Sequence, residues 1–92
     1  MKFAWNPRKA AVNRSKHGVA FEAAATVFAD RFARIFDDLA HSADEQREII
    51  IGHSTKGRLL VVSSIERDGV RIVSARKATK IEQLDYEEGT SK

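Results

Sequence analysis

The amino-acid sequence predicts an α+β fold, in which two N-terminal helices pack on a mostly antiparallel sheet and a further helix ends the chain. In the first third, apolar residues recur with helical spacing. Residues 48–76 instead contain β-branched runs separated by short turns with glycine. The predicted element order is β-α-α-β-β-β-β-α, within a single domain that covers residues 1–92.

The N-terminal part contains a short strand and two helices. Residues 2–5, KFAW, form the predicted strand. Asn6 suits the N-cap of the first helix, Pro7 suits its first turn, and Gly18 suits its end. The second helix has apolar residues at i, i+3, i+4 and i+7, namely Phe21, Ala24, Ala25 and Phe28.

The remaining strands follow a polar segment. Residues 31–36 form the first of them, and residues 37–47 are turn-like. Three further strands are predicted at 48–54, 58–67 and 69–76. The connections Lys56-Gly57 and Asp68-Gly69 suit tight turns, so these three strands are expected to form an antiparallel meander.

The C-terminal helix is predicted from a capping box. Thr79 and Glu82 have the spacing at which the two residues satisfy each other's backbone N–H groups. The helix is expected to run to about Glu88, with Gly89 beyond it. Because the N-terminal helices would cover one face of the sheet, the other face would be free to carry a site.

Composition excludes several classes of protein. The 92 residues include no cysteine, so neither a disulfide framework nor a thiolate metal site is available. No apolar stretch is long enough for a membrane span or a signal peptide, which predicts a cytoplasmic protein without membrane contact. The chain has no H-E-x-x-H motif and no calcium-loop pattern, so we expect no metal site.

Positive charge is concentrated in two blocks. Residues 1–20 contain five Lys or Arg and no acid, and residues 51–81 contain seven Lys or Arg and two acids. If the fold joins these blocks, the combined surface would attract a polyanion such as RNA. The alternative for either block alone is an ordinary solvated surface.

Arginines near the C-terminal meander are the main candidates for binding phosphate. A guanidinium stays charged and can bind phosphate oxygens bidentately, so Arg67, Arg71 and Arg76 suit both RNA binding and stabilisation of a transition state. The alternative is a surface ion pair with Glu66. Strict alternation would place Arg71 and Arg76 on opposite faces of the strand unless a bulge intervenes.

Other candidates have structural alternatives of similar weight. His17 could transfer protons, or it could simply complement the helix dipole. Tyr86 could donate a proton or pack against the sheet, and Trp5 could stack on a base or belong to the core. Lys9, Lys16 and Lys77 are the remaining candidates for RNA binding.

Three segments, FAWNPRKAAVNRSKHGVAFEAAATVF, HSADEQREIIIGHSTKGRLLVV and RIVSARKATKIEQLDYEE, together resemble the BrnT family, toxins of type II toxin–antitoxin systems. The match extends from Phe3 to Glu88. Its most specific parts are Trp5, Lys9, Asn13, Lys16, His17 and Gly18, the segment from His41-Ser42 to Arg47, and Ser74 to Thr79. The chain departs from the family at Asn6, where an acid is common, and at Ala20 and Ala23, where a capping box is common.

The resemblance implies a RelE-like fold and a cytoplasmic, cofactor-free toxin that cleaves RNA and blocks translation. It also implies a cognate antitoxin, BrnA-like and DNA-binding, which would form a hetero-oligomer with the toxin and carry the complex to promoter DNA. The toxin itself would contact promoter DNA only within that complex.

The expected reaction is metal-independent cleavage of RNA by attack of the ribose 2′-oxygen on the adjacent phosphate. Glu66 or His17 would act as the base, Tyr86 as a candidate acid, and the arginines as transition-state ligands. Two other classes stay open at this point: a nucleic-acid-binding module without catalysis, which uses the same basic surface, and a pure protein-interaction domain.

Overall fold

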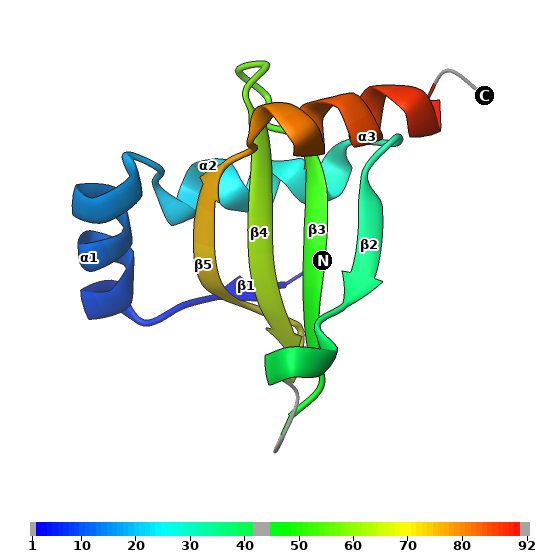
Figure 1. The fold of residues 1–92 in the computed structure, drawn as a ribbon. Helices are drawn as coiled ribbons and strands as arrows, with labels where there is room; N and C mark the ends of the chain where they lie inside the picture. Colours follow the sequence, from blue (N-terminus) through cyan, green and yellow to red (C-terminus); the bar gives the residue numbers. More distant parts are fainter. Residues whose placement is uncertain (1, 42–44, 91–92) are drawn as a thin grey trace.

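The computed structural model describes residues 2–41 and 45–90, without the side chains of His41 and Thr90. In chain order the elements are β1 (Phe3–Ala4), α1 (Pro7–His17), α2 (Phe21–Thr26), η1 (Val27–Ala29), β2 (Arg34–Asp37), η2 (Leu39–His41), β3 (Arg47–His53), β4 (Leu59–Glu66), β5 (Val70–Lys77) and α3 (Lys80–Thr90) (Figure 1). Apart from the 3₁₀ turns η1 and η2, this order confirms the predicted one. The α+β class is confirmed as well.

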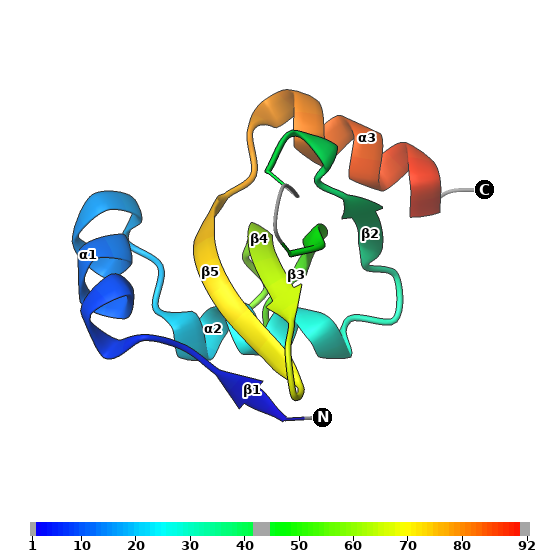
Figure 2. The same cartoon turned by 90° about the horizontal axis from the view of Figure 1, so that it is seen from below.

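The strands form one sheet in the order β1-β5-β4-β3-β2. The pairs β2–β3, β3–β4 and β4–β5 are antiparallel, which confirms the predicted meander. Only β1 is parallel to its neighbour, and it pairs Phe3 with Val70 and Ala4 with Arg71. Helix α1 lies on the β5 side of the sheet (Figure 2).

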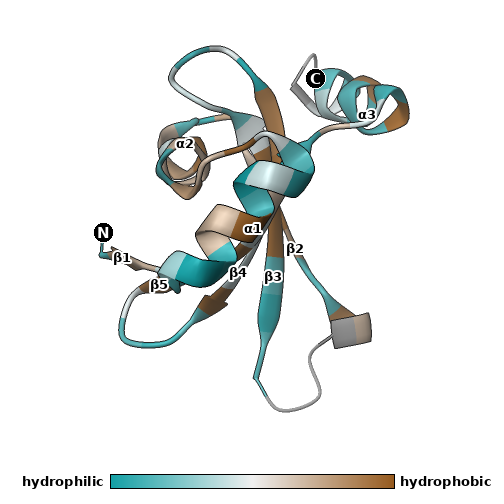
Figure 3. Cartoon of the chain, turned by 90° about the vertical axis from the view of Figure 1, so that its left-hand side faces the viewer, coloured by the Kyte–Doolittle hydropathy of each residue, from teal (hydrophilic) through white to brown (hydrophobic). Residues whose placement is uncertain are grey.

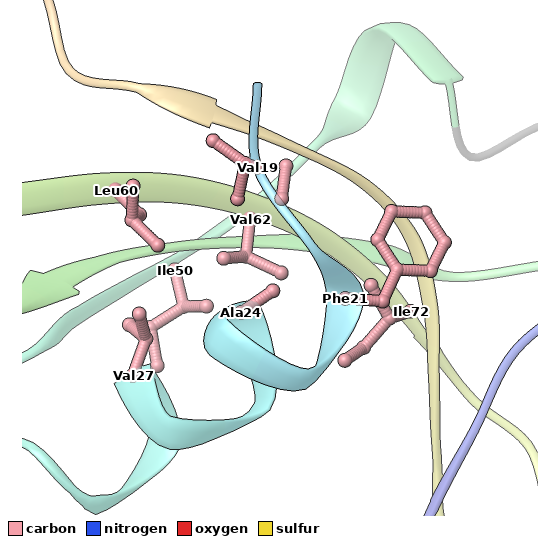
Figure 4. Close-up of a cluster of buried hydrophobic side chains, with 9 residues drawn as sticks. Val19, Phe21, Ala24, Val27, Ile50, Leu60, Val62 and Ile72 are labelled. Carbon is pink, nitrogen blue, oxygen red and sulfur yellow. The ribbon is translucent and has the colours of Figure 1, made fainter. Parts of the chain in front are cut away.

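The main core lies between α2 and one face of the sheet. Phe21, Ala24 and Val27 are fully buried there. They pack against strand residues that include Ile50, Leu60, Val62 and Ile72 (Figure 4). The predicted helical stripe differs in part, because Ala25 and Phe28 are only partly buried. After Thr26 the chain tightens into the 3₁₀ turn η1, which brings Val27 into the core instead.

The opposite face of the sheet is not entirely free, because α3 covers one end of it. Figure 3 views the sheet from its edge, with α2 on one side and α3 on the other. Tyr86 of α3 is only 5% exposed and packs with Ile51 and Val61. The sequence predicts that α3 is a helix, but it does not indicate that this helix crosses the face of the sheet opposite α2. The rest of the face is where a site can form.

Local sequence signals form as predicted at both ends of α1 and at the start of α3. The end of α3 differs from the prediction, because the helix continues through Gly89 instead of ending near Glu88. The Asn6 side chain accepts hydrogen bonds from the backbone N–H groups of Arg8 and Lys9, at 2.9 and 3.2 Å. Gly18 ends α1 with a left-handed φ of 69°. At α3, Thr79 and Glu82 form the reciprocal capping box, with N–O distances of 2.8 and 3.2 Å.

Helix α2 begins without a side-chain cap. Its N-cap is Ala20, which makes no capping hydrogen bond. This agrees with the loss of the capping box noted in the sequence. The helix is held instead by its buried apolar side chains, which is the usual source of stability for a short helix. Among the described residues, no helix has the length and apolar character that crossing a membrane requires.

Candidate functional site

A bulge in β5 places two candidate arginines on one face of the sheet. Ser63 pairs with Ser74 and Ser64 pairs with Ile72, so Val73 is an extra residue. Because of this extra residue, Ile72 and Ala75 both point into the core although they are three positions apart.

The same bulge settles the question that alternation left open. Arg71 lies opposite Ile65, and Arg76 lies opposite Val61. Directly paired residues share a face, so both arginines lie on the side of the sheet that α3 partly covers.

The central feature of the site is a polar depression of about 270 Å³, which we call the basic hollow. It is lined by Asn6, Lys9, Glu45, Arg47, Ile65, Arg67, Arg71, Ile72 and Val73. The four cations come from α1, β3, the β4–β5 turn and β5. The fold therefore joins part of the N-terminal basic block to the C-terminal hairpin.

The charged groups of the hollow differ in their partners. Arg67 forms an ion pair with Glu45, and both side chains are at least one-third exposed. By contrast, the guanidinium of Arg71 forms neither a hydrogen bond nor an ion pair with any other residue that the structure describes. Arg71 is thus available to an anionic ligand without first breaking a contact.

A second depression, of about 340 Å³, extends the basic hollow along α1. It is lined by Arg8, Lys9, Val12, Asn13, Lys16, His17, Val73 and Ser74. Because it shares Lys9 and Val73 with the basic hollow, the two form a continuous basic surface. The predicted RNA-binding residues Lys9 and Lys16, and the candidate base His17, all lie along it.

Asn13 fixes this surface in place. Its buried side chain donates to the carbonyl oxygens of Val19 and Ala75, both at 2.9 Å. It also accepts a hydrogen bond from the backbone N–H of Ala75 at 3.1 Å. Within the described part of the chain, strand β1 pairs with β5 only at Val70 and Arg71, so the outer edge of β5 at Ala75 has no neighbouring strand. The Asn13 amide makes hydrogen bonds to that edge and so holds α1 against the bulge.

The structure does not bring Arg76 into the basic hollow. At about 3.3 Å per residue it lies roughly 13–16 Å along β5 from Arg71. Its guanidinium forms a bidentate pair with Glu82, at 2.7 and 2.8 Å. The hydrogen bond with Arg76 lowers the pKa of Glu82 to about 2. We therefore assign Arg76 to anchoring the first turn of α3.

This pair predicts a pH-dependent stability. Because the pKa of Glu82 falls from about 4.5 to about 2 on folding, its contribution is present above pH 4.5 and is lost as the pH falls towards 2. Glu82→Gln should therefore lower the thermal unfolding midpoint at pH 7, and the difference from wild type should shrink between pH 4.5 and 2. Glu66→Gln, which alters an exposed carboxylate, is the control. A constant difference across that range would contradict the assignment.

Tyr86 is also separated from the hollow. Its hydroxyl donates a hydrogen bond to Asp30 Oδ2 at 2.7 Å and lies 3.2 Å from Nδ1 of His53. Burial, together with the hydrogen bond to Asp30, raises the pKa of Tyr86 to about 12. A phenol held in this way is a structural link between α3 and the loop at Asp30 rather than an accessible proton donor.

Three other predicted residues lie away from the hollow. Glu66 pairs with Val70 and therefore lies on the opposite face from Arg71. Lys77 pairs with Leu60, so it also points to the face opposite to that of the arginines. Trp5 is partly buried against the core, with its ring edge-on to Phe21 at 6.1 Å.

Reasoning from the residues alone missed Glu45 and Arg47. They lie at the end of the polar segment, and only the register shows that Arg47 and Arg71 both flank Ile65. Glu45 and Arg47 belong to the segment from His41-Ser42 to Arg47, which is one of the segments that resemble the family. Residues 42–44 of that segment lie outside the described residues. Within residues 2–41 and 45–90, no group of three or more His, Cys, Asp or Glu side chains could hold a metal ion.

A family model and a solved structure both relate this chain to the same group of proteins. Residues 5–82 match the family model described as the ribonuclease toxin BrnT of type II toxin–antitoxin systems. The crystal structure of the ribonuclease toxin BrnT from Brucella abortus is similar in fold, with a TM-score of 0.69 and 24% sequence identity over 87% of this chain and 99% of that one. No protein with a curated description shows significant sequence similarity to the chain. Since the family model covers most of the sequence, the chain belongs to the BrnT family of ribonuclease toxins.

Proposed function

We propose that the protein cleaves single-stranded RNA without a metal ion, by attack of a ribose 2′-oxygen on the adjacent phosphate, and so blocks translation in the cytoplasm. The observation that supports this most directly is the basic hollow. There Lys9, Arg47, Arg67 and Arg71, which come from distant segments, surround a space large enough for a phosphodiester.

The charges of the hollow suit this reaction. Attack by the 2′-oxygen creates a five-coordinate phosphorus with additional negative charge on its oxygens. Fixed cations stabilise that charge more than they stabilise the starting phosphate, which lowers the barrier. Positioning and charge stabilisation supply most of the rate in phosphoryl chemistry.

Glu45 is the best-placed proton acceptor in the hollow. The reaction requires a base for the 2′-hydroxyl, and Glu45 provides a carboxylate beside Arg67. As the bond from phosphorus to the 5′-oxygen breaks, the departing oxygen takes up a proton in turn and leaves as a 5′-hydroxyl. Of the two bases expected from the sequence, Glu66 lies on the other face of the sheet, and His17 lines the adjoining depression. We therefore propose Glu45 as the base, with His17 as the alternative.

Glu45→Gln should lower the rate of RNA cleavage by about 100-fold, the lower end of the range for a general base. The substitution keeps the size of the side chain but removes its ability to accept the proton. The measurement is kcat on a defined RNA, together with the binding affinity for an uncleavable analogue, which should stay within a few-fold of wild type. Glu66→Gln serves as the control. Equal losses in the two variants would exclude Glu45 as the base.

The proposed activity is tested with purified protein and end-labelled single-stranded RNA in EDTA. Fragments that end in a 2′,3′-cyclic phosphate and begin with a 5′-hydroxyl would support the mechanism. Intact RNA that is retarded in a gel would show a binding module without catalysis. Cleavage that requires added Mg²⁺ would overturn the metal-independent mechanism.

Membership of a type II toxin family implies a cognate antitoxin. We infer that this antitoxin is BrnA-like and DNA-binding, and that it covers the basic hollow with an acidic segment in a hetero-oligomer. Promoter DNA would then be bound through the complex rather than by the toxin alone. Full cleavage activity in a purified complex with the protein encoded by the neighbouring gene would contradict inhibition by occlusion.

A further inference from the structure

A second pocket, of about 230 Å³, lies between α3 and the sheet. It is lined by four apolar side chains, Phe36, Ile49, Ile51 and Val61, together with Arg34, Glu82, Asp85 and Tyr86. We call it the apolar pocket. Glu82 and Tyr86 have the structural roles described above, but no residue of this pocket has been assigned to binding RNA.

The apolar pocket opens on the same face of the sheet as the basic hollow. Ile49 of its wall is two residues from Arg47 of the hollow on β3. Residues two apart in a strand point the same way and are about 7 Å apart. That separation is comparable to the length of one nucleotide, so a single RNA strand can reach both sites.

The chemistry of the apolar pocket does not suit a phosphate. Its walls are hydrocarbon, and the carboxylates of Glu82 and Asp85 are among the residues around it. An anion placed there would lose hydration that the hydrocarbon walls do not replace. The pocket therefore suits a neutral occupant with an apolar surface.

Phe36 gives the apolar pocket a flat aromatic wall. Phe36 is 44% exposed, and the Arg34 guanidinium lies 5.4 Å from the centre of its ring. Single-stranded RNA is commonly held by stacking a splayed base on an aromatic ring or a guanidinium plane. A nucleobase is neutral, planar and apolar on its faces, which matches these requirements.

We propose that the apolar pocket binds one nucleobase of the RNA strand, next to the phosphate held in the basic hollow. This inference rests on the proposed function in that it takes RNA as the ligand, but it does not require cleavage. An apolar side chain from a protein partner is the competing occupant. Continuity with the cationic surface favours the nucleobase.

The test is binding of a short oligonucleotide with 2′-O-methyl riboses, which cannot be cleaved because no 2′-hydroxyl is present. Phe36→Ala should weaken binding about 5- to 150-fold, the range for losing one stacked base. The slope of log affinity against log salt should not change, because no phosphate contact is removed. On a strand of the same length without bases, the difference between wild type and Phe36→Ala should disappear.

Phe32→Ala is a closely matched control. Phe32 is also exposed, at 55%, and the Arg31 guanidinium lies 5.6 Å from its ring centre, but Phe32 does not line the apolar pocket. Its substitution should leave binding unchanged. If Phe36→Ala binds as tightly as Phe32→Ala, the nucleobase site is wrong.

The outcomes for the apolar pocket and for cleavage are separable. If wild type binds the uncleavable strand with the expected Phe36 dependence but leaves ordinary RNA intact, the nuclease proposal fails while the nucleobase site stands. If ordinary RNA is cleaved equally well by wild type and Phe36→Ala and their affinities are equal, the nucleobase site fails while the nuclease proposal stands.

Discussion

Arg71→Ala is expected to reduce RNA cleavage about 100- to 1,000-fold, the typical loss when one preorganised group that stabilises transition-state charge is removed. Arg71 lines the basic hollow and its guanidinium has no partner among the described residues, so its charge is available to the phosphate of a bound RNA. The loss should appear mainly in kcat, because a transition-state contact contributes little to binding of the substrate. Single-turnover cleavage of a defined RNA measures it directly.

Arg76→Ala is the matched control for Arg71→Ala. It removes the same side chain from the same face of the same strand, but Arg76 is held by Glu82 rather than facing the hollow. Its cleavage rate per folded molecule should stay within a few-fold of wild type, while its thermal unfolding midpoint should fall. An equal loss of kcat in both variants would mean that the hollow does not contain the reacting phosphate.

Asn13→Ala is expected to have the largest effect on stability. The change removes three hydrogen bonds from a side chain that is only 6% exposed. It leaves the N–H of Ala75 and the carbonyls of Ala75 and Val19 without their partner. Each buried group left unsatisfied costs about 1–3 kcal/mol, so a total loss of about 3 kcal/mol or more is expected. Urea unfolding followed by circular dichroism measures this difference.

Such a loss is a large fraction of the stability of a domain of this size, which is usually about 5–15 kcal/mol. Ser15→Ala, at an exposed position on the same helix, should change the unfolding free energy by less than about 0.5 kcal/mol. If Asn13→Ala were equally mild, α1 would not depend on this side chain for its position. RNA cleavage by the folded fraction should also fall, because α1 carries Lys9.

The parts of the fold that depend on neighbouring residues were predictable from the sequence. Asn6 caps the residues two and three positions after it, and Thr79 pairs with Glu82 within one helical turn. Such signals act over a few residues and need no knowledge of the rest of the fold. The β-branched runs and their glycine turns located β3, β4 and β5 for the same reason.

The candidate site was less predictable because it depends on register. The bulge at Val73 has no clear signature in the sequence VRIVSAR, yet it decides which way Arg76 points. Glu82 could be identified as a capping residue, but its pairing with Arg76 follows from where α3 crosses the sheet. Lys9 and Arg71 were recognisable in the sequence as members of two basic blocks, whereas the position of Arg47 beside them required the pairing of β3 with β4.

The extra residue in β5 sets how a change in the length of this strand would act. Deleting the codon for Val73 would make Ile72, Ser74, Ala75 and Arg76 consecutive residues, and strict alternation would then hold along the strand. Ala75 would still face the core, and Arg76 would stay on the face of Arg71. Sequences of this type should therefore tolerate the loss of this one residue without any change in the inward and outward pattern of β5.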